Sequence, residues 1–190
     1  MSFIEEIKQQ PDALRSFIND YFAGLHEEIE KLKEMVSKNK YNRFVFTGMG
    51  SSLYAAYPSC WFLRNKGLNS MAIEANELLN YCSDSFFDDK TLVIVVSQSG
   101  ESKETLALCD RLNTFANIII VTNYATKSLY KYGTVKFLIH AGFEAASASK
   151  TYTNTIAALM YLAYIIAGSP EKEIAKLEIS LSIHEKLQRE

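Results

Sequence analysis

The chain has 190 residues, enough for one domain with a substantial hydrophobic core. Hydrophobic residues make up 48% and charged residues 22%, an ordinary globular balance, and the formal charge of −2 argues against a nucleic-acid-binding face. No apolar run reaches the roughly 20 residues that span a membrane, and the first residues lack the basic-then-apolar order of a signal peptide. These features predict a cytoplasmic protein that binds neither nucleic acid nor membrane.

The cysteines and histidines show no pattern typical of a metal site. Cys60, Cys82 and Cys109 form no CxxC pair and have no metal-ligand spacing with the three scattered histidines. We interpret the cysteines as small hydrophobic residues in a reducing compartment, because Cys60 and Cys109 fall on apolar faces of expected helices. The sequence therefore predicts no metal site and no cofactor.

The first 40 residues are expected to be helical. Pro11 followed by Asp12 resembles a helix start, with proline in the first turn and an acid that complements the helix dipole. Apolar residues then recur at spacings of three and four, which indicates an amphipathic helix with one buried face. These apolar positions are Leu14, Phe17, Ile18, Tyr21, Leu25, Ile29, Leu32 and Met35.

Beyond residue 40 the sequence alternates between strand-like and helix-like segments. The strongest strand signal is a continuous β-branched run at residues 91–96, which is typical of a sheet covered on both faces. Expected strands cover residues 43–47, 69–73, 91–96, 117–122 and 134–139. Expected helices cover residues 52–66, 102–115 and 149–167, and a charged helix ends the chain.

This alternation predicts βαβ units and a parallel sheet. The expected fold class is α/β: a three-layer αβα sandwich with a five-stranded parallel sheet of the flavodoxin-like type, preceded by an N-terminal helical segment. We predict a helical segment at residues 1–40, the main domain at 41–168 and a C-terminal helix at 169–190. Because ligands of such folds bind at the carboxyl ends of the strands, the loops there are the candidate sites.

The loop at residues 97–102, Ser-Gln-Ser-Gly-Glu-Ser, leaves the most buried expected strand and opens a helix. Its hydroxyl and amide groups, the flexible Gly100 and the free N–H groups of the helix start would together cradle a phosphate. The GK[ST] ending of a nucleotide-binding P-loop is absent. The alternative is that Ser99 or Ser102 merely caps the helix.

A second loop, residues 47–52, contains Gly48 and Gly50 but has Leu53 where a dinucleotide fingerprint needs a third glycine. We therefore interpret Ser51 and Ser52 as hydroxyl donors to the same ligand rather than as part of a dinucleotide site. The third loop, residues 141–151, contains Glu144, which would bind sugar hydroxyls or move a proton. Glu144 fits a helix-capping residue or a surface residue equally well, and Lys150 fits a structural partner of Glu144.

The chain resembles a known family in these three loops and in two further segments. The segments are residues 4–14, 48–52, 75–78, 97–102 (with Ser102 where threonine is usual), 141–144 and 148–153, the last stretch being one residue shorter than the family pattern. The resemblance is to the SIS (sugar isomerase) domain family, specifically the first of two tandem SIS domains in the isomerase half of glucosamine-6-phosphate synthase (glutamine–fructose-6-phosphate aminotransferase). Related members are phosphosugar isomerases and deglycases.

The resemblance implies a set of side chains that hold the phosphate and nearby sugar oxygens: Ser51, Ser52, Ser97, Gln98, Ser99 and Ser102. It also implies that Glu144 lies beside the sugar. In the family a second SIS domain supplies the main proton-transfer acid and the lysine that reacts with the sugar carbonyl, and this sequence stops about where that half should begin. The expected partners are therefore a sugar phosphate and either a second copy of the chain, in a homodimer, or a protein that carries a second SIS domain.

Three functions follow as hypotheses. The first is a single SIS domain that binds a hexose or amino-hexose 6-phosphate, as half of a two-SIS isomerase. The alternative is an active homodimeric enzyme, an aldose–ketose isomerase or a deaminase or deglycase of sugar 6-phosphates, with Glu144 as the catalytic group and Glu77 as a weaker nominee. A transcription regulator is disfavoured, because the residues ahead of the first strand mix acidic and basic side chains and do not resemble a DNA reader.

Overall fold

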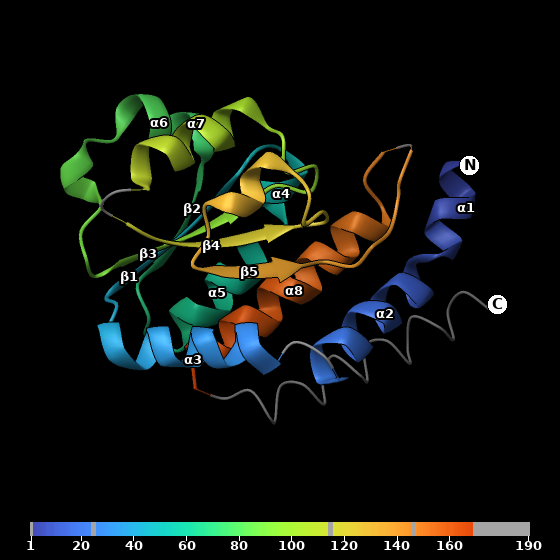
Figure 1. The fold of residues 1–190 in the computed structure, drawn as a ribbon, viewed down its shortest axis with the longest axis horizontal. Coiled ribbons are helices and arrows are strands. Elements are labelled where there is room, and N and C mark those ends of the chain that lie inside the picture. Colours follow the sequence, from blue (N-terminus) through green and yellow to red (C-terminus); the bar gives the residue numbers. More distant parts are fainter. Residues whose placement is uncertain (1, 24–25, 114–115, 146, 169–190) are drawn as a thin grey trace.

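The computed structural model describes residues 2–23, 26–113, 116–145 and 147–168. The C-terminal helix expected at residues 169–190 lies outside the described residues. The centre of the molecule is a sheet of five parallel strands in the order β2-β1-β3-β4-β5 (Figure 1). The strands are β1 (Arg43–Gly48), β2 (Ser70–Glu74), β3 (Thr91–Val96), β4 (Asn117–Thr122) and β5 (Val135–Leu138). This order is that of flavodoxin-like folds, which confirms the predicted fold class.

Helices cover both faces of the sheet, because side chains alternate between the faces along each strand. Phe44 and Phe46 pack into one hydrophobic cluster with the helices α5 (Tyr57–Asn65) and α8 (Lys150–Ile166). Val45, Val93 and Val95 pack into a second cluster with α6 (Ala75–Tyr81) and α7 (Lys103–Leu112). Figure 1 shows α6 and α7 on one side of the sheet and α3, α5 and α8 on the other, the three layers expected from the sequence.

The N-terminal helical segment is present, as predicted, and it is built into the core. It consists of α1 (Phe3–Lys8), α2 (Gln10–Ala23) and α3 (His26–Asn39). The apolar stripe predicted as one helix therefore belongs to two, α2 and α3, and Phe17 and Leu32 from these helices join the cluster that contains α8. The backbone N–H of Lys136 on the edge strand β5 donates to Glu28 Oε2 of α3 at 2.6 Å, so α3 also protects the sheet edge.

The segment expected as one helix at residues 52–66 forms two helices, α4 (Ser51–Tyr54) and α5. Pro58 stands in the first turn of α5, where its missing N–H is tolerated, whereas inside a continuous helix it would remove a hydrogen bond. Two short 3₁₀ helices, η1 (Asp84–Phe86) and η2 (Ser128–Lys131), were not expected either. The break between α4 and α5 places the short helix α4 directly at the end of β1.

Helix α8 is strongly apolar, and its apolar character fits its place in the fold. Its 17 residues are buried along most of their length between the sheet and the helices α2 and α5. Asn154 Nδ2 crosses between layers, because it donates to the carbonyl oxygens of Ala13 in α2 and of Ile139 after β5, both at 2.8 Å. Neither α8 nor any other helix in the described ranges is long and apolar enough to cross a membrane.

Candidate functional site

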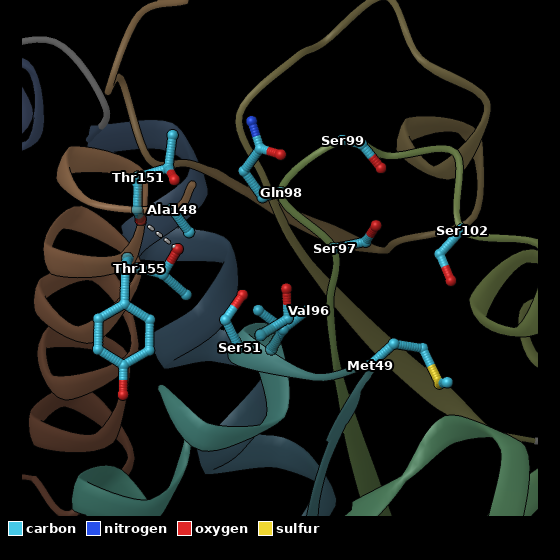
Figure 2. A pocket seen from close by; sticks show the side chains of 12 residues that line it. Met49, Ser51, Val96, Ser97, Gln98, Ser99, Ser102, Ala148, Thr151 and Thr155 are labelled. Carbon is cyan, nitrogen blue, oxygen red and sulfur yellow. Dashed lines mark hydrogen bonds between the residues drawn. The ribbon is translucent and has the colours of Figure 1, made fainter. Parts of the chain in front are cut away.

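A cavity of about 210 Å³ opens at the carboxyl ends of β1 and β3 (Figure 2). These two strands are neighbours in the sheet, but the chain leaves β1 toward β2 on one side and leaves β3 toward β4 on the other. Such a switch in strand order is where open α/β sheets bind their ligands. The cavity is lined by Met49, Ser51, Ser52, Val96, Ser97, Gln98, Ser99, Ser102, Ala148, Thr151, Tyr152 and Thr155.

The structure brings all six predicted phosphosugar-binding side chains to this cavity. Ser51 and Ser52 come from the first turn of α4, and Ser97, Gln98, Ser99 and Ser102 come from the loop after β3. Figure 2 shows the side chain of Ser51 across from that loop. That these side chains hold a phosphate remains a prediction, but their convergence on one cavity is a structural fact.

Backbone hydrogen bonds hold the loop after β3 in one shape, so its donors do not need to be ordered by a ligand. The N–H of Gly100 donates to the carbonyl of Ser97 at 3.2 Å, and the N–H of Leu129 donates to the carbonyl of Gly100 at 3.1 Å. The N–H of Asn123 donates to the carbonyl of Gln98 at 3.2 Å. Gly100 has φ +67°, and a Cβ there would stand 2.7 Å from the Cβ of Lys127, so only glycine fits this turn.

Ser102 occupies the N-cap position of α7, but its hydroxyl does not cap the helix. It donates instead to Glu104 Oε2 at 3.0 Å. Ser99 Oγ accepts a hydrogen bond from the N–H of Glu101 at 3.3 Å, which is a turn contact within the loop. The structure therefore does not show the capping role considered for the Ser102 side chain. The positive end of the α7 dipole lies at the loop that lines the cavity.

The third wall of the cavity belongs to α8, and the sequence analysis did not assign a binding role to it. Thr151 and Thr155 lie one helical turn apart on the same face, and Thr155 Oγ1 donates to the carbonyl oxygen of Thr151 at 2.7 Å (Figure 2). Ala148 and Tyr152 complete this wall. The signal in the sequence is the spacing of four residues between two threonines at the start of an otherwise apolar helix.

Glu144 caps α8 rather than lining the cavity. One carboxylate oxygen accepts hydrogen bonds from the N–H and Oγ of Ser149, at 2.9 and 2.8 Å, and from the N–H of Lys150 at 3.0 Å. The other accepts one from Thr151 Oγ1. Burial favours the neutral carboxyl, but the hydrogen bonds from Thr151 and Ser149 outweigh burial, so the pKa of Glu144 lies below its ordinary value. A catalytic role for Glu144 stays a prediction, and these contacts favour the capping role considered beside it.

The cavity is uncharged. Across the described ranges, its lining includes no lysine, arginine, histidine, aspartate or glutamate. Its polar groups are hydroxyls, one amide and the backbone N–H groups near the starts of α4 and α7, and neutral donors of this kind suit an anion. The described residues also contain no group of three or more Asp, Glu, His or Cys side chains that could hold a metal ion.

Two of the solved structures that share this fold show the lengths of chain in which it occurs. The C-terminal domain of glucosamine-fructose-6-phosphate aminotransferase from Francisella tularensis superposes with a TM-score of 0.77 and 21% identity, covering 98% of this chain and 53% of that chain. A Methanococcus jannaschii protein, for which a molecular function of 3-hexulose-6-phosphate isomerase has been inferred, superposes with a TM-score of 0.63 and 17% identity, covering 90% of this chain and 96% of that chain. The fold therefore occurs both within a chain about twice as long and in a chain of similar length.

Comparison of the sequence with known sequences also finds relatives and a domain family. The glutamine–fructose-6-phosphate aminotransferase [isomerizing] of Thermococcus kodakarensis is 29% identical over 184 residues, which is 94% of this chain but 30% of that protein. This chain thus spans less than a third of the length of that curated relative. The model of the SIS domain matches residues 37–167, which include both cavity loops and the whole of α8. Because this match covers well over half of the chain, the protein belongs to the SIS domain family.

Proposed function

We propose that the cavity binds the phosphate of a hexose or amino-hexose 6-phosphate, and that the chain acts as a single SIS domain that forms half of a two-SIS isomerase. One observation carries the proposal: two loops that open helices converge on one neutral cavity at the switch point of the sheet. Hydroxyl, amide and backbone N–H donors bind a phosphate without a counter-charge when a helix dipole points at it. The names of the relatives support a sugar phosphate as the ligand.

The sugar would extend from the phosphate toward the α8 wall. Thr151, Tyr152 and Thr155 line the cavity there. Sugars combine hydroxyl groups with apolar C–H faces, so a wall that mixes hydroxyls with an aromatic side chain suits them. The mixture supports a sugar phosphate over inorganic phosphate alone.

The lining supports binding more directly than catalysis. Aldose–ketose isomerisation needs a group that moves a proton between two carbons, and such a base lies within hydrogen-bond reach of the substrate. Among the described residues, the lining contains no carboxylate, imidazole or amine side chain, and Glu144 is engaged with the start of α8. We therefore propose that turnover requires a second SIS domain at the open side of the cavity, supplied by a partner protein; supply by a second copy in a homodimer belongs to the alternative function below.

The alternative function, an active isomerase, deaminase or deglycase as a homodimer, makes a different prediction for the isolated chain. It requires turnover without any added protein. Light scattering would establish whether the chain pairs with itself, and a panel of hexose and amino-hexose 6-phosphates would establish whether it turns over. Turnover by the purified chain would favour the alternative, whereas binding without turnover would favour the single-domain proposal.

Isothermal titration tests the binding itself. We expect fructose 6-phosphate and glucosamine 6-phosphate to bind, and fructose and glucosamine to bind far more weakly because the phosphate provides the main contacts. The absence of affinity for any sugar phosphate in the millimolar range would overturn the proposal. Equal affinity for the phosphorylated and unphosphorylated sugars would overturn the assignment of the serine loop as the phosphate site.

We further propose that this binding takes place in the cytoplasm. Cys60, Cys82 and Cys109 are all unpaired, and Cys60 and Cys109 are buried in the two hydrophobic clusters. Free thiols of this kind are typical of a reducing compartment. Fractionation of cells that produce the protein would test this location.

A further inference from the structure

Helix α1 reaches the cavity wall through two partly buried polar contacts. Glu6 is 0% exposed, and its Oε1 accepts a hydrogen bond from the N–H of Ala145 at 2.6 Å. Gln9, which follows α1, accepts a hydrogen bond on its Oε1 from Lys150 Nζ at 2.7 Å, and Lys150 is 5% exposed. Ala145 and Lys150 flank the segment that contains Ala148, a residue of the cavity wall. The first helix of the chain is thus tied to the wall from a distance of about 140 positions in sequence.

These polar contacts help to hold α1 in place. Glu6 is the buried residue of this helix, whereas Phe3 and Ile4 are 45% and 65% exposed. A carboxylate is strongly disfavoured in a buried position unless hydrogen-bond donors satisfy it there. A capping box between Ser2 and Glu5 also stabilises α1 as far as its first residue, and this helix carries Glu6. The N–H of Ala145 is one of the donors that satisfy the buried carboxylate of Glu6.

The wall segment, residues 144–145 and 147–151 of the described chain, is held from two sides. From within, Glu144 binds the N–H groups of Ser149 and Lys150 at the start of α8. From outside, Glu6 and Gln9 bind residues 145 and 150. The cavity residues Ala148 and Thr151 lie within or at the end of this segment, so their positions depend on both sets of contacts.

We propose that Glu6 and Gln9 are positioning residues for the ligand site. They hold this wall segment so that Ala148 and Thr151 keep the width of the cavity that fits the sugar phosphate, although neither Glu6 nor Gln9 lines the cavity. Docking of α1 and binding of the ligand are then coupled, and coupling is reciprocal: a bound ligand stabilises the docked α1 as much as α1 stabilises the bound ligand. The identity of the ligand in this inference rests on the proposed function, whereas the effect on the wall segment does not.

Glu6→Ala and Gln9→Ala test this inference, with Asp12→Ala as the matched control. Asp12 is a carboxylate on the neighbouring helix α2, its side chain is 80% exposed, and it contacts Arg15 on the same helix. Hydrogen–deuterium exchange by mass spectrometry reports on residues 144–151, and titration with fructose 6-phosphate and glucosamine 6-phosphate reports affinity. Both are measured at a temperature at which each variant is fully folded. A residue with a merely structural role would lower thermal stability but leave the affinity of the folded protein unchanged, so under these conditions a change in affinity indicates positioning.

We expect Glu6→Ala to speed exchange at residues 144–151, but not in β3 or β4, and to weaken the affinity by roughly tenfold or more. Gln9→Ala should have the same effect to a smaller degree, and Asp12→Ala should match the wild type. In the wild type, ligand should slow exchange in α1. Wild-type exchange at residues 144–151, or wild-type affinity, in Glu6→Ala would overturn the inference.

Two further outcomes remain decisive. If Glu6→Ala does not fold, Gln9→Ala is judged by the same two criteria. If the wild type binds no sugar phosphate, the proposed function fails by itself. Hydrogen–deuterium exchange then still tests how the wall is positioned. Faster exchange in the variant that is confined to residues 144–151 supports the inference, and unchanged exchange there overturns it.

Discussion

Gly48 at the end of β1 lies directly against the carbonyl oxygen of Val96 at the end of β3. A Cβ on Gly48 would stand 2.6 Å from that oxygen and 3.1 Å from the Cβ of Ser52. The two residues are paired in the register of the parallel strands. This close approach brings Ser51 and Ser52 within reach of the loop that follows β3, so one glycine determines the spacing between two sides of the cavity.

Gly48→Ala should force the ends of β1 and β3 apart. We expect a loss of about 1–3 kcal/mol in the free energy of unfolding, as for an overpacked core position, together with weaker sugar-phosphate binding. Chemical denaturation and titration calorimetry measure the two effects. Gly67→Ala is the control, because a Cβ there meets open space at the far end of α5, and it should lose some stability without loss of affinity. Equal affinity in Gly48→Ala and the wild type would contradict this account.

The hydroxyl of Ser97 should contribute directly to phosphate affinity. Ser97 is nearly buried, lies at the end of the central strand and lines the cavity. We expect Ser97→Ala to weaken sugar-phosphate binding by roughly five- to tenfold, the effect of one hydrogen bond to a charged group. Ser37→Ala is the control, since Ser37 Oγ donates to the carbonyl of Glu34 on the distant helix α3. A Ser97→Ala protein that binds as tightly as Ser37→Ala would remove Ser97 from the phosphate site.

The sheet could be predicted from the sequence because its signals are local. Residues 91–96 and 117–122 are continuous apolar runs between polar turns, and both strands begin and end where the sequence places them. The two cavity loops follow from the same logic, because the carboxyl ends of parallel strands share one edge of the sheet. The contacts of Glu144 are local too, five to seven positions away, and the capping role was among the alternatives for it.

The parts of the site that could not be predicted depend on contacts between distant segments. The contacts of Glu6 with Ala145 and of Gln9 with Lys150 join residues about 140 positions apart, and no periodicity in α1 points to them. The wall formed by Thr151 and Thr155 becomes part of the cavity only once α8 packs beside the ends of β1 and β3. Packing of this kind depends on the whole fold, so a pattern within one helix does not reveal it.

The cysteines should differ in reactivity, because burial raises the pKa of the Cys60 and Cys109 thiols to about 12. The thiolate is the reactive form, so both residues should resist alkylation at pH 8. Cys82, which is partly exposed, should react first. Mass spectrometry after brief treatment with iodoacetamide should find one label on the native protein and three after unfolding in guanidinium. Labelling of Cys60 or Cys109 before unfolding would show that the core opens readily.

Glu144 should make stability depend on pH in a way that distinguishes capping from catalysis. Its pKa is lowered in the folded protein, so the unfolded chain binds its proton more readily than the folded chain does. The stabilisation is therefore complete above the unfolded pKa, about 4.3 for glutamate, and is lost as the pH falls through the lower folded value. Glu144→Gln should be less stable than the wild type by about 1–2 kcal/mol at pH 7, because a charge-assisted acceptor is lost, and the difference should disappear at acidic pH.

The measurement is denaturant unfolding of the wild type and Glu144→Gln between pH 7 and pH 3, with Asp12→Asn on the exposed face of α2 as the control. The free energy of unfolding of Asp12→Asn should change with pH nearly as that of the wild type does, because an exposed ion pair contributes little to stability. Sugar-phosphate affinity at pH 7 separates the two roles further. A cap that shapes the wall at Thr151 should affect stability and affinity together, since both depend on the start of α8. A catalytic base would instead leave stability and affinity near wild type while turnover by the purified chain is lost, and that result would return Glu144 to the catalytic role.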